Sequence, residues 1–135
     1  MSDYAKPIPT PSEDSQVYWE AAKNHELKLQ QCGACSAFRF PPAEVCSECT
    51  SDAYEWKPVS GKGRVFSFVI YHRAYHPGFK EELPYVVAVI ELDEGPRMLS
   101  NVTGCKPEEV RCDMPVEVTY ENITDEMTLP KFRPA

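Results

Sequence analysis

Two closely spaced pairs of cysteines constrain the fold of this chain more than any other feature of its sequence. Two residues separate the cysteines within each pair, and ten residues lie between the pairs; the four are Cys32, Cys35, Cys46 and Cys49. Structural zinc is bound by four such ligands in a tetrahedron, and each pair can place two sulfur atoms at the tip of one hairpin. The spacing predicts a zinc ribbon that binds one zinc ion per chain.

The ligand set also predicts a structural rather than a catalytic zinc. Four protein sulfur atoms complete the coordination shell and leave no position for a water molecule. A zinc deaminase would carry His-x-Glu ahead of Pro-Cys-x-x-Cys, whereas here His25 is followed directly by Glu26, and a valine precedes Cys46. A structural site contributes on the order of 10 kcal/mol of apparent binding energy, which would stabilise a lobe with a small apolar core.

Composition and the N-terminal sequence bear on where the protein works. The six cysteines would suggest disulfides in a secreted chain. Residues 1–11, however, are polar and proline-rich, unlike a signal peptide, and no apolar run approaches the ~18–20 residues of a membrane span. We therefore expect a cytoplasmic protein that does not enter a membrane, where paired cysteines indicate metal binding. The formal net charge of −7 disfavours general binding to nucleic acid phosphates.

A helix-start signal precedes the cysteine pairs. Thr10 is a capping residue, Pro11 suits the first helical position, and a glutamate follows three residues after the cap. Together they predict a short amphipathic helix over roughly 11–24, with Tyr18 and Trp19 on or beside its apolar face. That face either packs on the rest of the protein or docks on a partner protein.

The rest of the chain shows strand patterns. Ribbon strands are expected at 27–31, 38–40 and 54–59. After a glycine-containing turn, five more strands are expected at 64–72, 85–92, 98–102, 116–121 and 127–132, with a helical turn at 107–110. This order matches the five-stranded barrel called the OB-fold. We therefore predict a mainly β fold made of an N-terminal tail and helix (1–26), a zinc ribbon (27–59) and an OB-fold barrel (60–135).

The connection between the first two barrel strands is a second candidate site. It is long for a hairpin loop and combines aromatic with basic residues, namely His72, Arg73, His76, Phe79 and Lys80. Such residues on a rigid barrel are typical of a binding loop, although a solvated connection would have a similar composition.

The sequence shows no recognisable catalytic set. Neither a Ser-His-Asp arrangement, nor a phosphate-binding glycine loop, nor a pair of catalytic acids stands out. Cys105 and Cys112 lie in or beside turn-like sequence without an evident base, so we interpret both as incidental thiols rather than nucleophiles.

Seven segments, in order, resemble a known family of proteins over roughly residues 12–134. They are YWEAA at 18–22, LKLQQCGAC at 27–35, FPPAEVC at 40–46, SGKGRVFSF at 60–68, LPYVVA at 83–88, ELDEG at 91–95 and PKFRP at 130–134. The family is the zinc-ribbon/OB-fold family of acyl-CoA-associated proteins, long catalogued as a domain of unknown function. The resemblance implies an N-terminal helix, a rubredoxin-like zinc ribbon and an OB-fold barrel.

The resemblance also implies a function. Members of this family are accessory subunits of thiolase-superfamily enzymes, including thiolases and acyl-CoA aldolases, which form or cleave carbon–carbon bonds in lipid metabolism. The chain would then bind acyl-CoA, complete a heteromeric complex and leave the nucleophile to the larger subunit. Because CoA phosphates need cations, Arg73, His76 and Lys80 are the expected phosphate contacts, and Phe79 and Tyr85 the expected contacts of the adenine or pantetheine arm.

Two other functions stay open at this stage. Ribbons and OB barrels often bind RNA or single-stranded DNA, so a nucleic-acid-binding module is the alternative, which the acidic charge disfavours. A scaffold without a ligand is the other. The subunit hypothesis further predicts exposed aromatic residues that dock on the larger subunit, for which Tyr18, Trp19 and Phe79 are the candidates.

Overall fold

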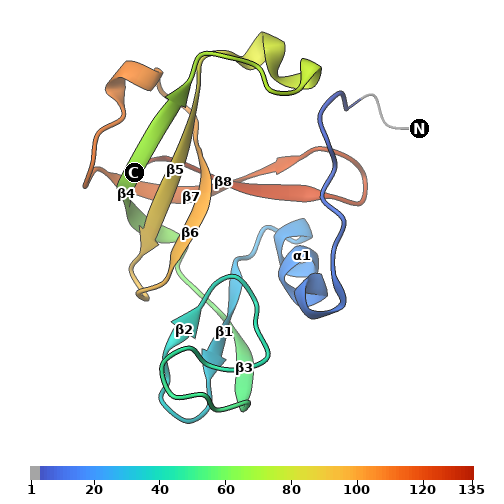
Figure 1. Ribbon diagram of the computed structural model, residues 1–135, viewed down its shortest axis with the longest axis vertical. Coiled ribbons are helices and arrows are strands. Elements are labelled where there is room, and N and C mark those ends of the chain that lie inside the picture. The colour runs from blue at the N-terminus through green and yellow to red at the C-terminus, as the bar shows by residue number, and fades with distance from the viewer. Residues whose placement is uncertain (1–3) are drawn as a thin grey trace.

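The computed structural model describes residues 4–135, so residues 1–3 of the expected tail lie outside the described part. It contains a three-stranded sheet, a closed five-stranded barrel and one short α-helix beside them (Figure 1). No helix within residues 4–135 is long and apolar enough to cross a bilayer. The prediction of a mainly β fold is confirmed, whereas the division of the chain after residues 26 and 59 stays a prediction.

The N-terminal helix is shorter than the sequence predicts. A 3-10 turn, η1 (Glu13–Ser15), continues into α1 (Gln16–Lys23). The cap is Ser12 rather than Thr10, because the Ser12 N–H donates to the Oγ of Ser15 at 2.9 Å and the Ser15 N–H bonds the carbonyl of Ser12. The helix ends where the N–H of Asn24 bonds the carbonyl of Ala21 at 3.0 Å.

The apolar face of α1 packs on the rest of the protein. Tyr18 is only 5% exposed, and its ring lies 5.0 Å from that of Trp19 and 5.4 Å from that of Phe40 in the ribbon. Trp19 and Phe79 are half-buried. The prediction of an exposed docking surface is therefore wrong for Tyr18, because α1 and the ribbon share one apolar core with the barrel. Trp19 and Phe79 keep part of their surface exposed, and for them it stays a prediction.

The ribbon sheet has β1 at its centre. Strand β1 (Lys28–Cys32) pairs antiparallel with β2 (Phe38–Arg39) on one side and β3 (Tyr54–Pro58) on the other. The fully buried Gln30 joins the sheet to the following loop, since its Oε1 accepts from Arg39 Nε at 2.7 Å and from the Ala43 N–H at 2.9 Å. The predicted ribbon strands overlap all three observed strands.

The barrel is closed in the order β4-β5-β6-β8-β7, with β6 and β8 parallel and the other pairs antiparallel. Its strands are β4 (Lys62–Tyr71), β5 (Tyr85–Leu92), β6 (Arg97–Val102), β7 (Pro115–Asn122) and β8 (Thr128–Pro134). A 3-10 turn, η3 (Pro107–Glu109), lies between the third and fourth strands. This arrangement confirms the predicted OB-fold barrel.

The long loop between β4 and β5 contains a further 3-10 helix, η2 (Pro77–Glu82). The N-terminal segment 4–9 packs closely against it, because a Cβ atom added at Gly78 would lie 2.5 Å from the carbonyl oxygen of Ala5. Two parts of the chain that are distant in sequence therefore meet at one end of the barrel.

Candidate functional site

The first candidate site is the cluster of four cysteines. Their Sγ atoms all lie within 4.8 Å of one another, and the Cys32–Cys49 and Cys35–Cys46 pairs are both 3.6 Å apart. A disulfide needs about 2.05 Å, so these are not disulfide distances. Zinc–sulfur bonds of about 2.3 Å in a tetrahedron place sulfur atoms roughly 3.8 Å apart. The four side chains therefore fit a tetrahedral zinc ion.

Both cysteine pairs use the same backbone turn. The residue after each pair, Ser36 or Thr50, has a φ of 64°, in the left-handed region. Its N–H then bonds the carbonyl of the first cysteine of the pair, at 3.0 Å for Cys32 and 2.9 Å for Cys46. Small or short polar residues suit these positions because a bulky side chain would be strained there.

The turns also direct backbone N–H groups at the sulfur atoms. Hydrogen bonds from the backbone of Cys35 and Ala34 lower the pKa of Cys32, while contacts among the four thiols raise the pKa of Cys35 and of Cys49. The backbone N–H of Cys49 lowers the pKa of Cys46 in the same way. Because zinc binds thiolates rather than thiols, these N–H groups favour the form of the ligand that a metal requires. A zinc ion here would join the end of β1 to the loop before β3 and would leave no open coordination position.

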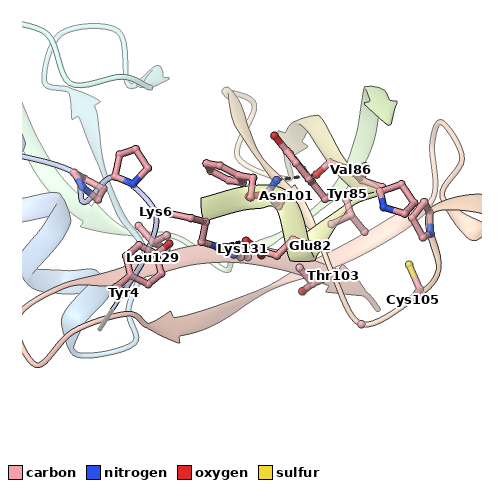
Figure 2. Close-up of a pocket in the computed structure, with 17 residues that line it drawn as sticks. Tyr4, Lys6, Glu82, Tyr85, Val86, Asn101, Thr103, Cys105, Leu129 and Lys131 are labelled. Atoms are coloured by element: carbon pink, nitrogen blue, oxygen red, sulfur yellow. Dashed lines mark hydrogen bonds and ion pairs between the residues drawn. The ribbon is translucent and has the colours of Figure 1, made fainter. Parts of the chain in front are cut away.

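The second candidate site is a pocket at the end of the barrel. Its volume is about 380 Å³, and it lies between the N-terminal segment, η2, the adjoining ends of β5 and β6, and β8 (Figure 2). Its walls include Lys6, Phe79, Tyr85, Thr103, Cys105 and Lys131. This volume is within the range of small-molecule sites, which begins at about 300 Å³.

An ion pair closes the side of the pocket formed by the N-terminal segment. The Nζ of Lys6 lies 2.6 Å from Oε2 of Glu82, and its side chain is 9% exposed. The same ammonium group lies 5.1 Å from the ring centre of Tyr4 and 5.2 Å from that of Phe79, which is cation–π geometry. Burial favours the neutral amine, but hydrogen bonds with Glu82 and Tyr4 outweigh it and raise the pKa of Lys6. Lys6 therefore stays charged.

A second lysine reaches the pocket from β8. Lys131 and Leu129 line the pocket, while Phe132 points into the barrel core. The side chain of Lys131 is 12% exposed and forms an ion pair with Glu121 on β7. Both pocket lysines therefore already have a carboxylate partner.

Two of the five residues expected to contact CoA line this pocket. The rings of Phe79 and Tyr85 stack 5.3 Å apart, and Tyr71 extends the row, 5.1 Å from Tyr85. Burial raises the pKa of Tyr85, so its hydroxyl stays protonated and able to donate a hydrogen bond at neutral pH.

The other three, Arg73, His76 and Lys80, are not among the residues that line it. The Arg73 guanidinium lies 5.5 Å from the ring centre of Tyr75, outside the pocket. His76 caps η2, because its Nδ1 accepts the N–H of Gly78 at 3.0 Å. Lys80 is on η2 and exposed. Within the described chain, neither Arg73 nor Lys80 forms an ion pair.

Sequence reasoning missed the two pocket lysines. Lys6 lies in a proline-rich segment that carries no strand or helix pattern, so no local signal could place it. Lys131 had a signal, because it alternates with the buried Phe132 and so must face away from the core.

Cys105 lies in the pocket wall, well apart from Lys6 and Glu82 (Figure 2). Burial, together with the charge of Glu109, raises the pKa of its thiol. The thiol is therefore protonated near neutral pH, which is the unreactive form. Cys112 is exposed and lies outside this pocket.

Two family models match consecutive parts of the chain. The rubredoxin-like zinc ribbon domain of ChsH2 matches residues 19–55, and the C-terminal OB-fold domain of ChsH2 matches residues 56–121. The four cysteines lie in the first part, whereas most of the pocket wall belongs to the second.

Individual proteins are similar over most of this chain. A probable enoyl-CoA hydratase alpha subunit of Thermomonospora curvata is 39% identical over 96% of this chain and 40% of its own length. A benzoylsuccinyl-CoA thiolase subunit, BbsA, of Thauera aromatica is 31% identical over 73% of this chain and 66% of its own. The chain thus spans only about two fifths of the first of these relatives.

A solved structure shares the whole architecture. In the structure described as the Ltp2-ChsH2(DUF35) aldolase, one chain matches with a TM-score of 0.84 and 38% identity, over 93% of this chain and 98% of that one. The ribbon, the barrel and the helix beside them therefore occur together in a solved relative. On these matches, the chain belongs to the DUF35 family, with the zinc ribbon and OB-fold of the ChsH2 type.

Proposed function

We propose that this chain is an accessory subunit that assembles with a larger thiolase-superfamily enzyme, helps it bind acyl-CoA and contributes no nucleophile. The observation that carries the proposal is the match over almost the whole chain to a DUF35 chain of an aldolase structure. A relative named as a subunit of a CoA thiolase supports the same class of partner.

The proposal includes one structural zinc per chain, on Cys32, Cys35, Cys46 and Cys49. The sulfur distances, the N–H groups directed at the sulfurs and the matching ribbon model all support it. A closed shell of four sulfurs gives the metal no position for water, so it would stabilise the ribbon without taking part in a reaction.

The spare thiols support a non-catalytic role. A cysteine nucleophile reacts as the thiolate, and burial of Cys105 favours the thiol instead. The larger subunit would then supply the reacting group, while this chain shapes the path by which the acyl-CoA reaches it.

We place the acyl-CoA at the end of the barrel that carries the pocket. The aromatic side chains of Phe79 and Tyr85 suit the pantetheine arm or the adenine. Lys6 is already neutralised by Glu82, so it is a poor phosphate contact. Arg73 and Lys80, exposed and without ion pairs in the described chain, are better suited to the CoA phosphates.

Co-expression with each thiolase-superfamily protein of the same genome tests the assembly. We expect one of them to co-purify, and its thioester cleavage, acyl transfer or retro-aldol activity to depend on this chain. Turnover by the chain alone, lost in Cys105→Ala, would contradict the proposal.

Calorimetry of the complex with acyl-CoA tests the ligand contacts. Arg73→Ala and Lys80→Ala are expected to weaken binding severalfold, because each removes a charge-assisted phosphate contact. Lys57→Ala, which removes an exposed lysine from the ribbon, is the matched control. Unchanged affinity in both loop variants would remove these residues from the site without affecting the proposed assembly.

A further inference from the structure

The outer face of strands β4, β5 and β6 carries five apolar side chains and only two polar ones, Ser67 and Asn101, between its charged and aromatic ends. Phe66 is 46% exposed, Val69 54% and Leu99 66%, while Val87 and Val89 are half-buried. These five residues are called the β4–β6 patch below. In an antiparallel sheet with one face in the core, the other face normally alternates to polar residues. The patch therefore departs from what a free barrel would carry.

The register makes this patch continuous. Val69 on β4 lies opposite Val87 on β5, and Val89 on β5 lies opposite Leu99 on β6. Side chains on one face of neighbouring strands are roughly 5 Å apart at such positions. The strands lie on the side of the barrel away from α1 and the N-terminal segment (Figure 1). A contiguous apolar surface of this kind marks an interaction site more often than scattered exposed residues do.

One end of the patch carries positive charge. The three strands contain Lys62, Arg64 and Arg97 but only one acid, Glu91, which gives +3 − 1 = +2 in a chain of net charge −7. Asp93 and Asp113, in the adjoining loops, lie near Arg64 and offset part of this charge, so Arg97 is the cation that faces the patch. Both arginines bond Glu91, Arg64 at 2.8 Å and Arg97 at 3.2 Å. The Arg97 guanidinium also lies 3.7 Å from the ring centre of Phe66, so it is held directly over the edge of the patch.

From these observations, and resting on the proposed function, we infer that the β4–β6 patch is the docking surface for the larger subunit. The partner surface is apolar at its centre and acidic opposite Arg97, because charge at an interface rim is complementary. A second copy of this chain is a poorer occupant. Two copies joined through the same face would set each cationic end against the other copy's cationic end or its Tyr71–Tyr85 end, depending on the direction of the two-fold axis, and the three strands supply no acid besides Glu91 at either end.

This placement connects docking with the pocket. Tyr71 and Tyr85 are paired at the other end of the same face, with ring centres 5.1 Å apart. Tyr85 also lines the pocket. A subunit that covers the patch therefore borders the pocket mouth.

Charge insertion into the patch tests the inference. Val69→Glu and Leu99→Glu lie on different strands, and both side chains are exposed enough for the fold to tolerate the change. Each is expected to weaken binding to the co-purifying thiolase-superfamily subunit by about tenfold or more, measured by calorimetry or biolayer interferometry. Val45→Glu is the matched control, since Val45 is 50% exposed but lies in the ribbon. Circular dichroism and zinc content should be unchanged in all three.

The cationic end has its own matched pair of variants. The side chains of Arg97 and Arg133 are 53% and 55% exposed, and each pairs with one glutamate, but Arg133 is on β8. Arg97→Glu is expected to slow association and to reduce its dependence on salt, while Arg133→Glu leaves both unchanged.

The outcomes separate this inference from the proposed function. If both patch variants bind the larger subunit with the affinity of the wild type, the assignment of the docking surface is wrong, but the subunit proposal is unaffected. A wild-type chain that binds none of the thiolase-superfamily proteins overturns both. Self-association of the wild type that Leu99→Glu abolishes would assign the patch to a second copy and overturn the choice of partner.

Discussion

The ribbon and the barrel are both small β structures, yet their interiors differ in composition. The buried side chains of the ribbon are Leu27, Leu29, Gln30, Cys32 and Cys46, of which only two are aliphatic. The barrel interior is mostly apolar, as in β5, where Val86, Ala88, Ile90 and Leu92 alternate inward, and in β8, which contributes Phe132. The ribbon therefore depends on its cysteine cluster for what the barrel obtains from apolar burial.

Removing one cysteine should have the largest effect. Cys46→Ala deletes one of four ligands, and structural zinc contributes on the order of 10 kcal/mol. We expect zinc to be lost and the amides of β1–β3 to exchange rapidly with deuterium, while β5 and β6 stay protected. Zinc analysis and hydrogen exchange check this. Cys112→Ala removes an exposed thiol outside the cluster and should change neither. Full protection of β1–β3 in the zinc-free variant would show that apolar burial is enough for the ribbon.

A substitution in the barrel core should destabilise the barrel instead. Phe132 is fully buried in the barrel core, so Phe132→Ala is expected to reduce the free energy of unfolding by about 3–5 kcal/mol. Denaturation in urea measures it. Leu99→Ala, at an exposed position, should change the free energy by about 0.5 kcal/mol or less. Zinc should remain bound by the ribbon as long as the barrel of Phe132→Ala is folded. Loss of zinc at the urea concentration that unfolds the barrel would mean that the two regions unfold as one unit.

The N-terminal segment 4–9 contains no helix or strand of its own, unlike either region. A Cβ atom at Gly78 would lie 2.5 Å from the backbone oxygen of Ala5, so Gly78→Ala should displace the segment and separate Lys6 from Glu82. We expect faster hydrogen exchange in residues 4–9 with a nearly unchanged melting temperature. Lys80→Ala, on the same 3-10 helix but exposed, is the control. Unchanged exchange in Gly78→Ala would mean that η2 shifts instead.

Local sequence patterns were enough to predict both regions. The ribbon follows from spacing within each cysteine pair, and the barrel strands follow from alternation, as in β5, whose bounds were predicted without error. The helix start was placed two residues too early because Thr10 and Ser12 are both good caps, and only the observed hydrogen bond of Ser12 with Ser15 distinguishes them.

What could not be predicted depends on contacts between distant segments. Lys6 and Lys131 lie near opposite ends of the chain and meet the same pocket only in the fold. Tyr18 looked available to a partner because nothing in the sequence says that the ribbon covers it. The β4–β6 patch was not predicted for the opposite reason. Valine and leucine are expected in strands, and the sequence alone does not reveal which strand face stays exposed to solvent.

The smallest expected effect is a change of stability at acid pH, which differs between the barrel and the ribbon. Hydrogen bonds from Arg64 and Arg97 lower the pKa of Glu91. A lowered pKa in the folded state gives stability that is present above the ordinary glutamate range and is lost as the pH falls through the lowered value. Glu91 is near the surface, so the contribution to the barrel is small. The ribbon should respond first, because zinc binding needs thiolates and weakens as protons compete for them.

Hydrogen exchange of β5 should therefore show a small stability difference between wild type and Glu91→Gln at neutral pH, which disappears in strong acid after the ribbon has opened. Glu108→Gln, at an exposed position without an ion pair in the described chain, should show no such difference. A Glu91 difference that persists in strong acid would mean that the variant acts through packing, in particular by moving Arg97 off Phe66, and not through charge.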